Sequence, residues 1–133
     1  MKTTISTLML LLLLTAGILT ACKPATDDMI QIGEQDAGKT ITLKTGDTLV
    51  VSLDGNMTTG FNWVPAPQNP VLLKQVGEPE VTPDSSELGA PGKIVLKFEA
   101  AAKGQTILHL DYKRPWEENT APEKVFDVTV VVK

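Results

Sequence analysis

The sequence predicts an all-β domain, an antiparallel sandwich of about seven strands. From residue 30 onward, apolar and polar residues alternate with a period of two, the pattern of a strand with one buried face. Glycine, proline and asparagine interrupt the alternation about every 8 to 12 residues, which is the spacing of turns in β-sandwiches. Residues 30–133 show no segment with the three-to-four-residue spacing of an amphipathic helix.

The strands can be placed in chain order. The alternation begins at Ile30 and Ile32 and continues at Ile41 and Leu43. Further strands are expected at 48–53, 61–64, 93–100, 105–112 and 125–132, with one or two irregular strands within 71–82, interrupted at Gly77 and Pro79. The side chains expected to face inward are Leu49, Val51, Leu53, Ile94, Leu96, Phe98, Ala100, Leu108, Leu110, Tyr112, Phe126, Val128, Val130 and Val132.

This arrangement is typical of the immunoglobulin-like sandwich, here without its disulfide because the chain has one cysteine. In strand 61–64 either Phe61 and Trp63 or Asn62 and Val64 face inward. About 100 residues are enough for one domain with a core of its own.

Residues 1–21 have the organisation of a secretory signal peptide. Lys2 provides the positive start, and the apolar run from Leu8 to Leu14 is shorter than the roughly 20 residues that span a bilayer. The segment 19–22, Leu-Thr-Ala-Cys, resembles a bacterial lipobox, in which the cysteine is acylated and becomes the first residue of the mature chain. The alternative is an ordinary cleaved signal, but the only cysteine stands at the one position that a lipobox requires.

We therefore expect a lipoprotein of the bacterial cell envelope, anchored by lipid on Cys22 to a membrane outside the cytoplasm, periplasmic or at the cell surface. Residues 22–29 would form the acylated cysteine and a polar tether, and residues 30–133 a monomeric domain. With Cys22 acylated, the mature chain has no thiol for a disulfide, a nucleophile or a metal site.

The composition argues against several functions. The formal net charge is −4, and Arg114 is the only arginine, so the chain has no basic stripe for nucleic acid. The single histidine, His109, lies mid-strand on the expected solvent face, which makes a small hydrolase a weak hypothesis. We expect no cofactor and no metal; Glu117-Glu118 fits a solvated loop, with weak calcium binding as the alternative.

Three segments carry the unusual residues of the domain: the first loop (54–60), the second loop (88–92) and the third loop (113–117). Alternate connections of an antiparallel sandwich share one end, so we expect the three loops to lie side by side. Turn formation explains the glycines, and Trp116 could cover the open end of the core. Exposed Trp116 and Arg114 would instead fit an interface, on a loop pre-ordered by Pro115.

At these residues the sequence resembles the chagasin family of cysteine peptidase inhibitors. The family has an Asn-Pro-Thr-Thr-Gly-aromatic segment, a glycine-rich segment and an Arg-Pro-Trp segment, in its B–C, D–E and F–G loops. The matching residues here are Asn56, Met57, Thr58, Thr59, Gly60 and Phe61, then Leu88, Gly89, Ala90, Pro91 and Gly92, then Arg114, Pro115 and Trp116. Two positions depart from the family pattern: Met57 replaces a proline, which predicts a less rigid loop, and Pro91 replaces a glycine.

The resemblance implies an immunoglobulin-like fold and reversible, non-covalent inhibition of papain-like cysteine peptidases. The first loop would enter the active-site cleft, and the other two would contact its walls. The alternative is a structural or adhesive envelope lipoprotein, because a fold alone does not define a function. The sequence leaves open whether the loops face the membrane or point away from it.

Overall fold

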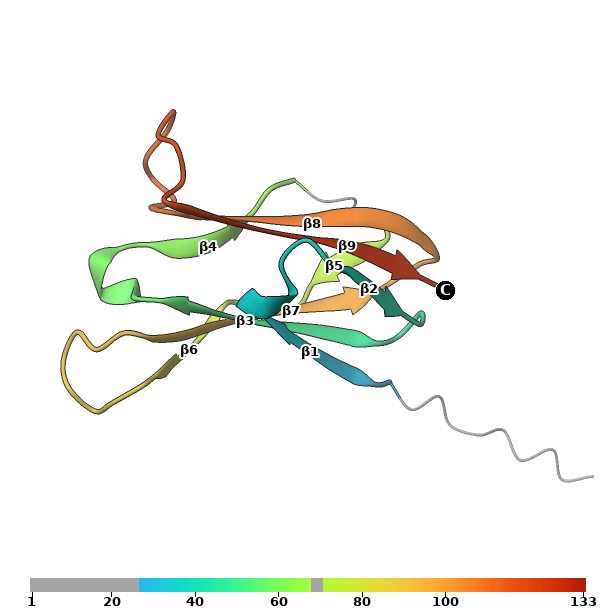
Figure 1. Cartoon of the computed structure of the whole chain (residues 1–133), viewed down its shortest axis with the longest axis horizontal. Helices are drawn as coiled ribbons and strands as arrows, with labels where there is room; N and C mark the ends of the chain where they lie inside the picture. The colour runs from blue at the N-terminus through green and yellow to red at the C-terminus, as the bar shows by residue number, and fades with distance from the viewer. Residues whose placement is uncertain (1–26, 68–70) are drawn as a thin grey trace, which may run out of the picture.

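The computed structural model describes residues 27–67 and 71–133, which form a two-layer β-sandwich (Figure 1). The predicted signal peptide (1–21) and Cys22 lie outside the described residues. One sheet has the strand order β1-β3-β7-β5, with β6 also paired to β7, and the other has the order β2-β9-β8-β4. Their bounds are β1 Met29–Gly33, β3 Thr48–Gly55, β5 Leu73–Gln75, β6 Glu80–Pro83 and β7 Gly92–Ala100 in the first sheet, and β2 Thr40–Leu43, β4 Asn62–Pro65, β8 Gly104–Lys113 and β9 Lys124–Val132 in the second.

The core lies between the two sheets and consists of the alternate residues of the long strands. Every residue predicted to face inward is buried, and in β4 Trp63 is buried while Phe61 packs against the core from just before the strand. The choice left open for strand 61–64 is therefore settled in favour of Phe61 and Trp63. The all-β sandwich of the sequence analysis is confirmed, and its stability comes from packing in the absence of any disulfide.

The sandwich is not purely antiparallel. β1 runs parallel to β3, with Met29 opposite Thr48, and β2 runs parallel to β9, with Ile41 opposite Val130. Both short strands lie at sheet edges, and the 3₁₀ turn η1 (Glu34–Asp36) connects them as the chain passes from one sheet to the other. Alternation within a strand does not specify which neighbour it pairs with, which is why the sequence did not predict these parallel pairs.

Residues 71–83 form two strands on the same partner. β5 pairs with the end of β7 near Ala100, and β6 pairs with its start near Gly92. Gly77, with φ 71°, lies in the break between them, so the irregular segment predicted at Gly77 and Pro79 consists of two short strands paired with different parts of β7.

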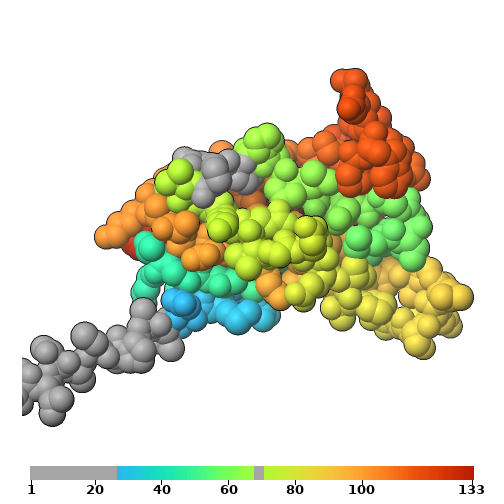
Figure 2. Space-filling view, turned by 180° about the vertical axis from the view of Figure 1, so that it is seen from behind, coloured from blue at the N-terminus to red at the C-terminus, as the bar shows by residue number. Residues whose placement is uncertain are grey.

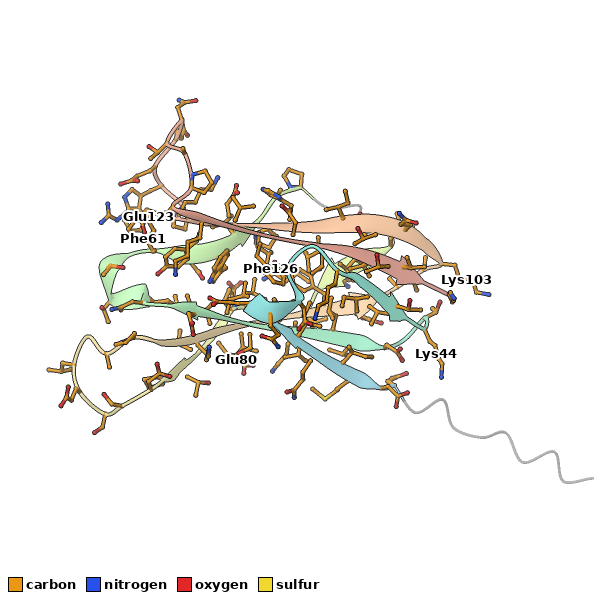
Figure 3. All side chains as sticks on the ribbon, viewed as in Figure 1. Lys44, Phe61, Glu80, Lys103, Glu123 and Phe126 are labelled. Atoms are coloured by element: carbon orange, nitrogen blue, oxygen red, sulfur yellow. The ribbon has the colours of Figure 1, made fainter. Side chains whose placement is uncertain are left out.

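The chain enters the sandwich at the end opposite the three loops (Figure 1). The backbone N–H of Thr48 donates to the carbonyl of Asp28 at 2.9 Å, and that of Asp28 donates to the buried carboxylate of Asp47 at 3.2 Å. Asp28 and Met29, assigned to the tether from sequence, are thus part of the fold. Figure 3 places Lys44 and Lys103 at this end and Phe61 and Glu123 at the other. Within residues 27–67 and 71–133 no helix is long and apolar enough to cross a membrane.

Candidate functional site

The three loops predicted from sequence lie together at one end of the sandwich (Figure 1). The first loop connects β3 to β4, the second precedes β7, and the third follows β8. In the space-filling view the second and third loops project on either side of the first (Figure 2). Because each loop joins strands that are paired within the two sheets, the sandwich holds its ends in place.

The tip of the first loop is a single 3₁₀ turn, η2 (Met57–Thr59), capped by Asn56. The carboxamide oxygen of Asn56 accepts from the backbone N–H of Thr58 at 3.0 Å, and its backbone carbonyl accepts from the hydroxyl of Thr59 at 2.7 Å. Gly60 ends the turn at φ 83°, a left-handed conformation that favours glycine. Local hydrogen bonds therefore determine the shape of this tip.

Hydrogen bonds also connect the first loop to both neighbours. The carboxamide nitrogen of Asn56 donates to the carbonyl of Gly89 in the second loop at 3.0 Å. From the third loop, Nε of Arg114 donates to the carbonyl of Thr59 at 3.1 Å, while Nη1 contacts Glu117 at 3.0 Å. The three loops thus form one connected surface.

Trp116 is exposed and does not plug the core. Its side chain is 67% exposed, and its indole lies over Gly60, where an added Cβ would come within 3.0 Å of Cζ2. Phe61, Trp63 and Tyr112 occupy the core end instead, with the rings of Phe61 and Tyr112 stacked at 5.3 Å between centroids. This arrangement leaves the indole available to a partner.

Three large apolar side chains are exposed on this end: Met57, Leu88 and Trp116, one on each loop. Leu88 is fully exposed at the tip of the second loop, and Met57 is 39% exposed. The second loop is closed at its base by the N–H of Asp84 donating to the carbonyl of Pro91 at 3.0 Å. Of these side chains, exposed tryptophan is the type most enriched where protein interfaces concentrate their binding energy.

Tyr112 is a residue of this region that the sequence analysis placed only in the core. Its hydroxyl accepts a hydrogen bond from the backbone N–H of Asn56 at 2.9 Å, directly beneath the first loop. Its ring supports Phe61, over which the guanidinium of Arg114 lies at 4.5 Å from the ring centroid. In the sequence, the one signal for the contact between Tyr112 and the first loop was that Tyr112 faces inward two residues before Arg114.

His109 lies away from the loops, on the outer face of the β8–β9 sheet. Its Nδ1 contacts Asp127 across the strand pair, its Nε2 contacts Asp111 at 3.0 Å, and Lys113 approaches Asp111 at 3.6 Å. The hydrogen bond to Asp127 raises the pKa of the imidazole above its usual value; burial, the next largest effect, opposes it, and the hydrogen bond to Asp111 adds to the rise. The contacts fit a cross-strand ion pair.

Comparisons with known proteins point to one family. The model of the family described as "Chagasin family peptidase inhibitor I42" matches residues 42–130. Chagasin of Trypanosoma cruzi is 32% identical over 85 residues, covering 59% of this chain and 76% of the relative.

Solved structures show the same fold. The crystal structure of the cysteine protease inhibitor EhICP2 from Entamoeba histolytica has a TM-score of 0.69 at 20% identity, covering 80% of this chain and 96% of that one. The structure of PbICP-C in complex with falcipain-2 has a TM-score of 0.51 at 19% identity, covering 80% of this chain and 99% of that one.

Proposed function

The chain belongs to the chagasin family of peptidase inhibitors, and we propose that it inhibits papain-like cysteine peptidases by placing its three loops over the active-site cleft. The observation that carries this proposal is the connection of the loops through Asn56 and Arg114, which presents them as one surface. The likeness to the cysteine protease inhibitor EhICP2, and to PbICP-C in its complex with falcipain-2, supports the choice of target.

In the proposed complex, the tip Thr58-Thr59-Gly60 enters the cleft and covers the catalytic cysteine and histidine. Its small side chains allow the backbone to approach closely, and the left-handed Gly60 departs from the extended conformation of a substrate strand. The described residues include no cysteine, so they cannot form a mixed disulfide with the catalytic thiol, in keeping with the non-covalent, reversible inhibition proposed.

The flanking loops contact the two walls of the cleft. Leu88, Gly89, Ala90, Pro91 and Gly92 form one contact segment, and Arg114, Pro115 and Trp116 form the other. Leu88 and Trp116 supply the apolar contact area. Because hydrogen bonds already hold the loops in place, little conformational entropy is lost on binding. A standard protease–inhibitor interface buries about 1,600 Å² in total, which three adjoining loops can provide.

Titration of the purified protein against papain-like peptidases, with a fluorogenic substrate, tests the proposal. We expect inhibition that fits one inhibitor per peptidase and disappears on dilution. Absence of inhibition at micromolar concentration across such peptidases would overturn the proposal. Retention of envelope proteins by the same sample, without inhibition, would support the adhesive alternative.

We also propose that lipid on Cys22 anchors the protein, as a monomer, in the bacterial cell envelope. The support is the lipobox-like segment 19–22, together with the entry of the chain at the end opposite the loops. Residues 22–27 extend at most about 20 Å, so the sandwich would lie near the membrane with its loops pointing away from it. Replacing Cys22 with serine should move the protein from the membrane fraction to the soluble fraction; unchanged membrane association would contradict the anchor.

A further inference from the structure

Tyr112 lies at the junction of the core and the loops. It is the last inward residue of β8, it is buried, and its ring is 5.3 Å from that of Phe61 and 5.1 Å from that of Trp63. Lys124 lies over its ring at 5.5 Å. Contacts with two aromatic rings and one ammonium group hold the buried ring, and its hydroxyl lies at the base of the first loop.

The hydroxyl forms a hydrogen bond with Asn56, the first residue after β3. The backbone N–H of Asn56 donates to it at 2.9 Å across 56 positions of sequence. Asn56 is also the residue whose side chain caps η2 and donates to Gly89. One hydrogen bond from the core therefore positions the residue on which the first and second loops both depend.

The ring of Tyr112 also reaches the third loop, through Phe61. Phe61 stacks on Tyr112 with an interplanar angle of 28°, and Arg114 lies over Phe61 while donating to the carbonyl of Thr59. A shift of Tyr112 would therefore displace contacts of all three loops.

We propose that Tyr112 is a positioning residue of the inhibitory surface, acting through its hydroxyl on Asn56 and through its ring on Phe61. This inference rests on the proposed function. A tyrosine that only filled the core would need its ring and not its hydroxyl, because phenylalanine would pack equally well at the same place. The hydroxyl is thus the part of the side chain that distinguishes a positioning role from a packing role.

The experiment compares the inhibition constants of wild type, Tyr112→Phe and Val130→Ala. Tyr112→Phe keeps the ring and leaves the N–H of Asn56 without its partner, so we expect the inhibition constant to rise about tenfold. Val130, buried in β9 beside β2, provides the control: its truncation lowers the unfolding temperature and leaves the inhibition constant unchanged. If the wild type inhibits and Tyr112→Phe has the same inhibition constant, the positioning role of Tyr112 is wrong but the proposed function stands. If none of the three proteins inhibits, the proposed function itself is wrong.

Two further readouts separate positioning from packing. Amide hydrogen exchange in the wild type should show slow exchange at Asn56 compared with Leu88, and Tyr112→Phe should remove that protection. Exchange at Asn56 as fast as at Leu88 in the wild type would contradict the inference even if the variant failed to fold. Adding Met57→Pro to Tyr112→Phe should recover part of the lost inhibition, because proline at residue 57 also orders the first loop. If the double variant recovers no inhibition, the positioning role of Tyr112 is contradicted.

Discussion

The indole of Trp116 lies directly over the α-carbon of Gly60, so the third loop covers the end of the first. An alanine at residue 60 would bring a Cβ to 3.0 Å from Cζ2 of the indole, and closer still to Cη2. The exposed aromatic residue and the left-handed glycine are therefore one structural unit of the proposed binding surface, and neither can change without affecting the other.

Gly60→Ala should weaken inhibition strongly while the sandwich stays folded. The substitution is strained at φ 83° and displaces the indole, so both the tip of the first loop and Trp116 would move. We expect the inhibition constant to rise at least tenfold, measured by titration. Gly38→Ala, at φ 77° with no atom near its missing Cβ, is the matched control; an equal loss of inhibition there would contradict a local effect.

Trp116→Ala should weaken binding by roughly 2 kcal/mol, about thirtyfold in the inhibition constant. Because the side chain is 67% exposed, its loss should change the free energy of unfolding little. Inhibition assays and thermal unfolding of the same sample check both points. An unchanged inhibition constant would remove Trp116 from the interface.

Asn56→Asp isolates the hydrogen bond between the first and second loops. The aspartate keeps an oxygen acceptor for the N–H of Thr58 but cannot donate to the carbonyl of Gly89. We expect inhibition to weaken about fivefold, and Asn56→Ala, which also removes the acceptor of the backbone N–H and the hydroxyl of Thr58, to weaken it further. Equal inhibition constants for the two variants would mean that the link to Gly89, and not the cap of the turn, accounts for the whole effect.

Met57→Pro should strengthen inhibition by about two- to fivefold. Asn56 has an extended backbone (φ −135°, ψ 99°), outside the α region that a following proline disfavours, and residue 57 is the first of a 3₁₀ turn, a position that proline favours in helices. The substitution reduces the entropy lost on ordering the loop, by about 0.4 to 1 kcal/mol. Weaker inhibition by Met57→Pro would show that the methionine side chain itself contacts the peptidase.

The ion pair at His109 should make stability depend on pH. The pKa of the His109 imidazole is higher in the folded state than in the unfolded state, where it is about 6.5. The ion pair therefore stabilises the fold fully at a pH below about 6.5, and this stabilisation is lost as the pH rises through the pKa of the folded state. His109→Gln should therefore be less stable than wild type at pH 5.5 and closer to it at pH 8.5, by chemical denaturation. A difference independent of pH would contradict this, and inhibition should be the same in both proteins.

The sequence was sufficient for the long strands and insufficient for the connections between loops. β7, β8 and β9 alternate without interruption, so Phe98, Leu110 and Val128 could be placed in the core from period alone. The donor–acceptor pairs Asn56–Gly89 and Arg114–Thr59 join residues 33 and 55 positions apart, and no local pattern specifies them. The cap of the first loop by Asn56 was likewise not visible in the sequence, and the expectation that Met57 leaves this loop less rigid than proline would stays a prediction.

The orientation of the molecule also required the structure. The sequence left open which end of the sandwich the chain enters, and the parallel pairing of β1 with β3 places this entry opposite the loops. Between these two strands the chain crosses to the other sheet through η1 and β2 and returns.

Protection of the peptidase's catalytic thiol from alkylation tests the occlusion of the cleft most directly. Papain would be mixed with an equimolar amount of the purified protein, treated with iodoacetamide, and diluted to release the inhibitor. If the loops cover the cleft, the thiol stays unmodified in the complex, one molecule of inhibitor protects one of peptidase, and full activity returns on dilution. Alkylation at the rate of free papain, while substrate turnover is still inhibited, would contradict this occlusion.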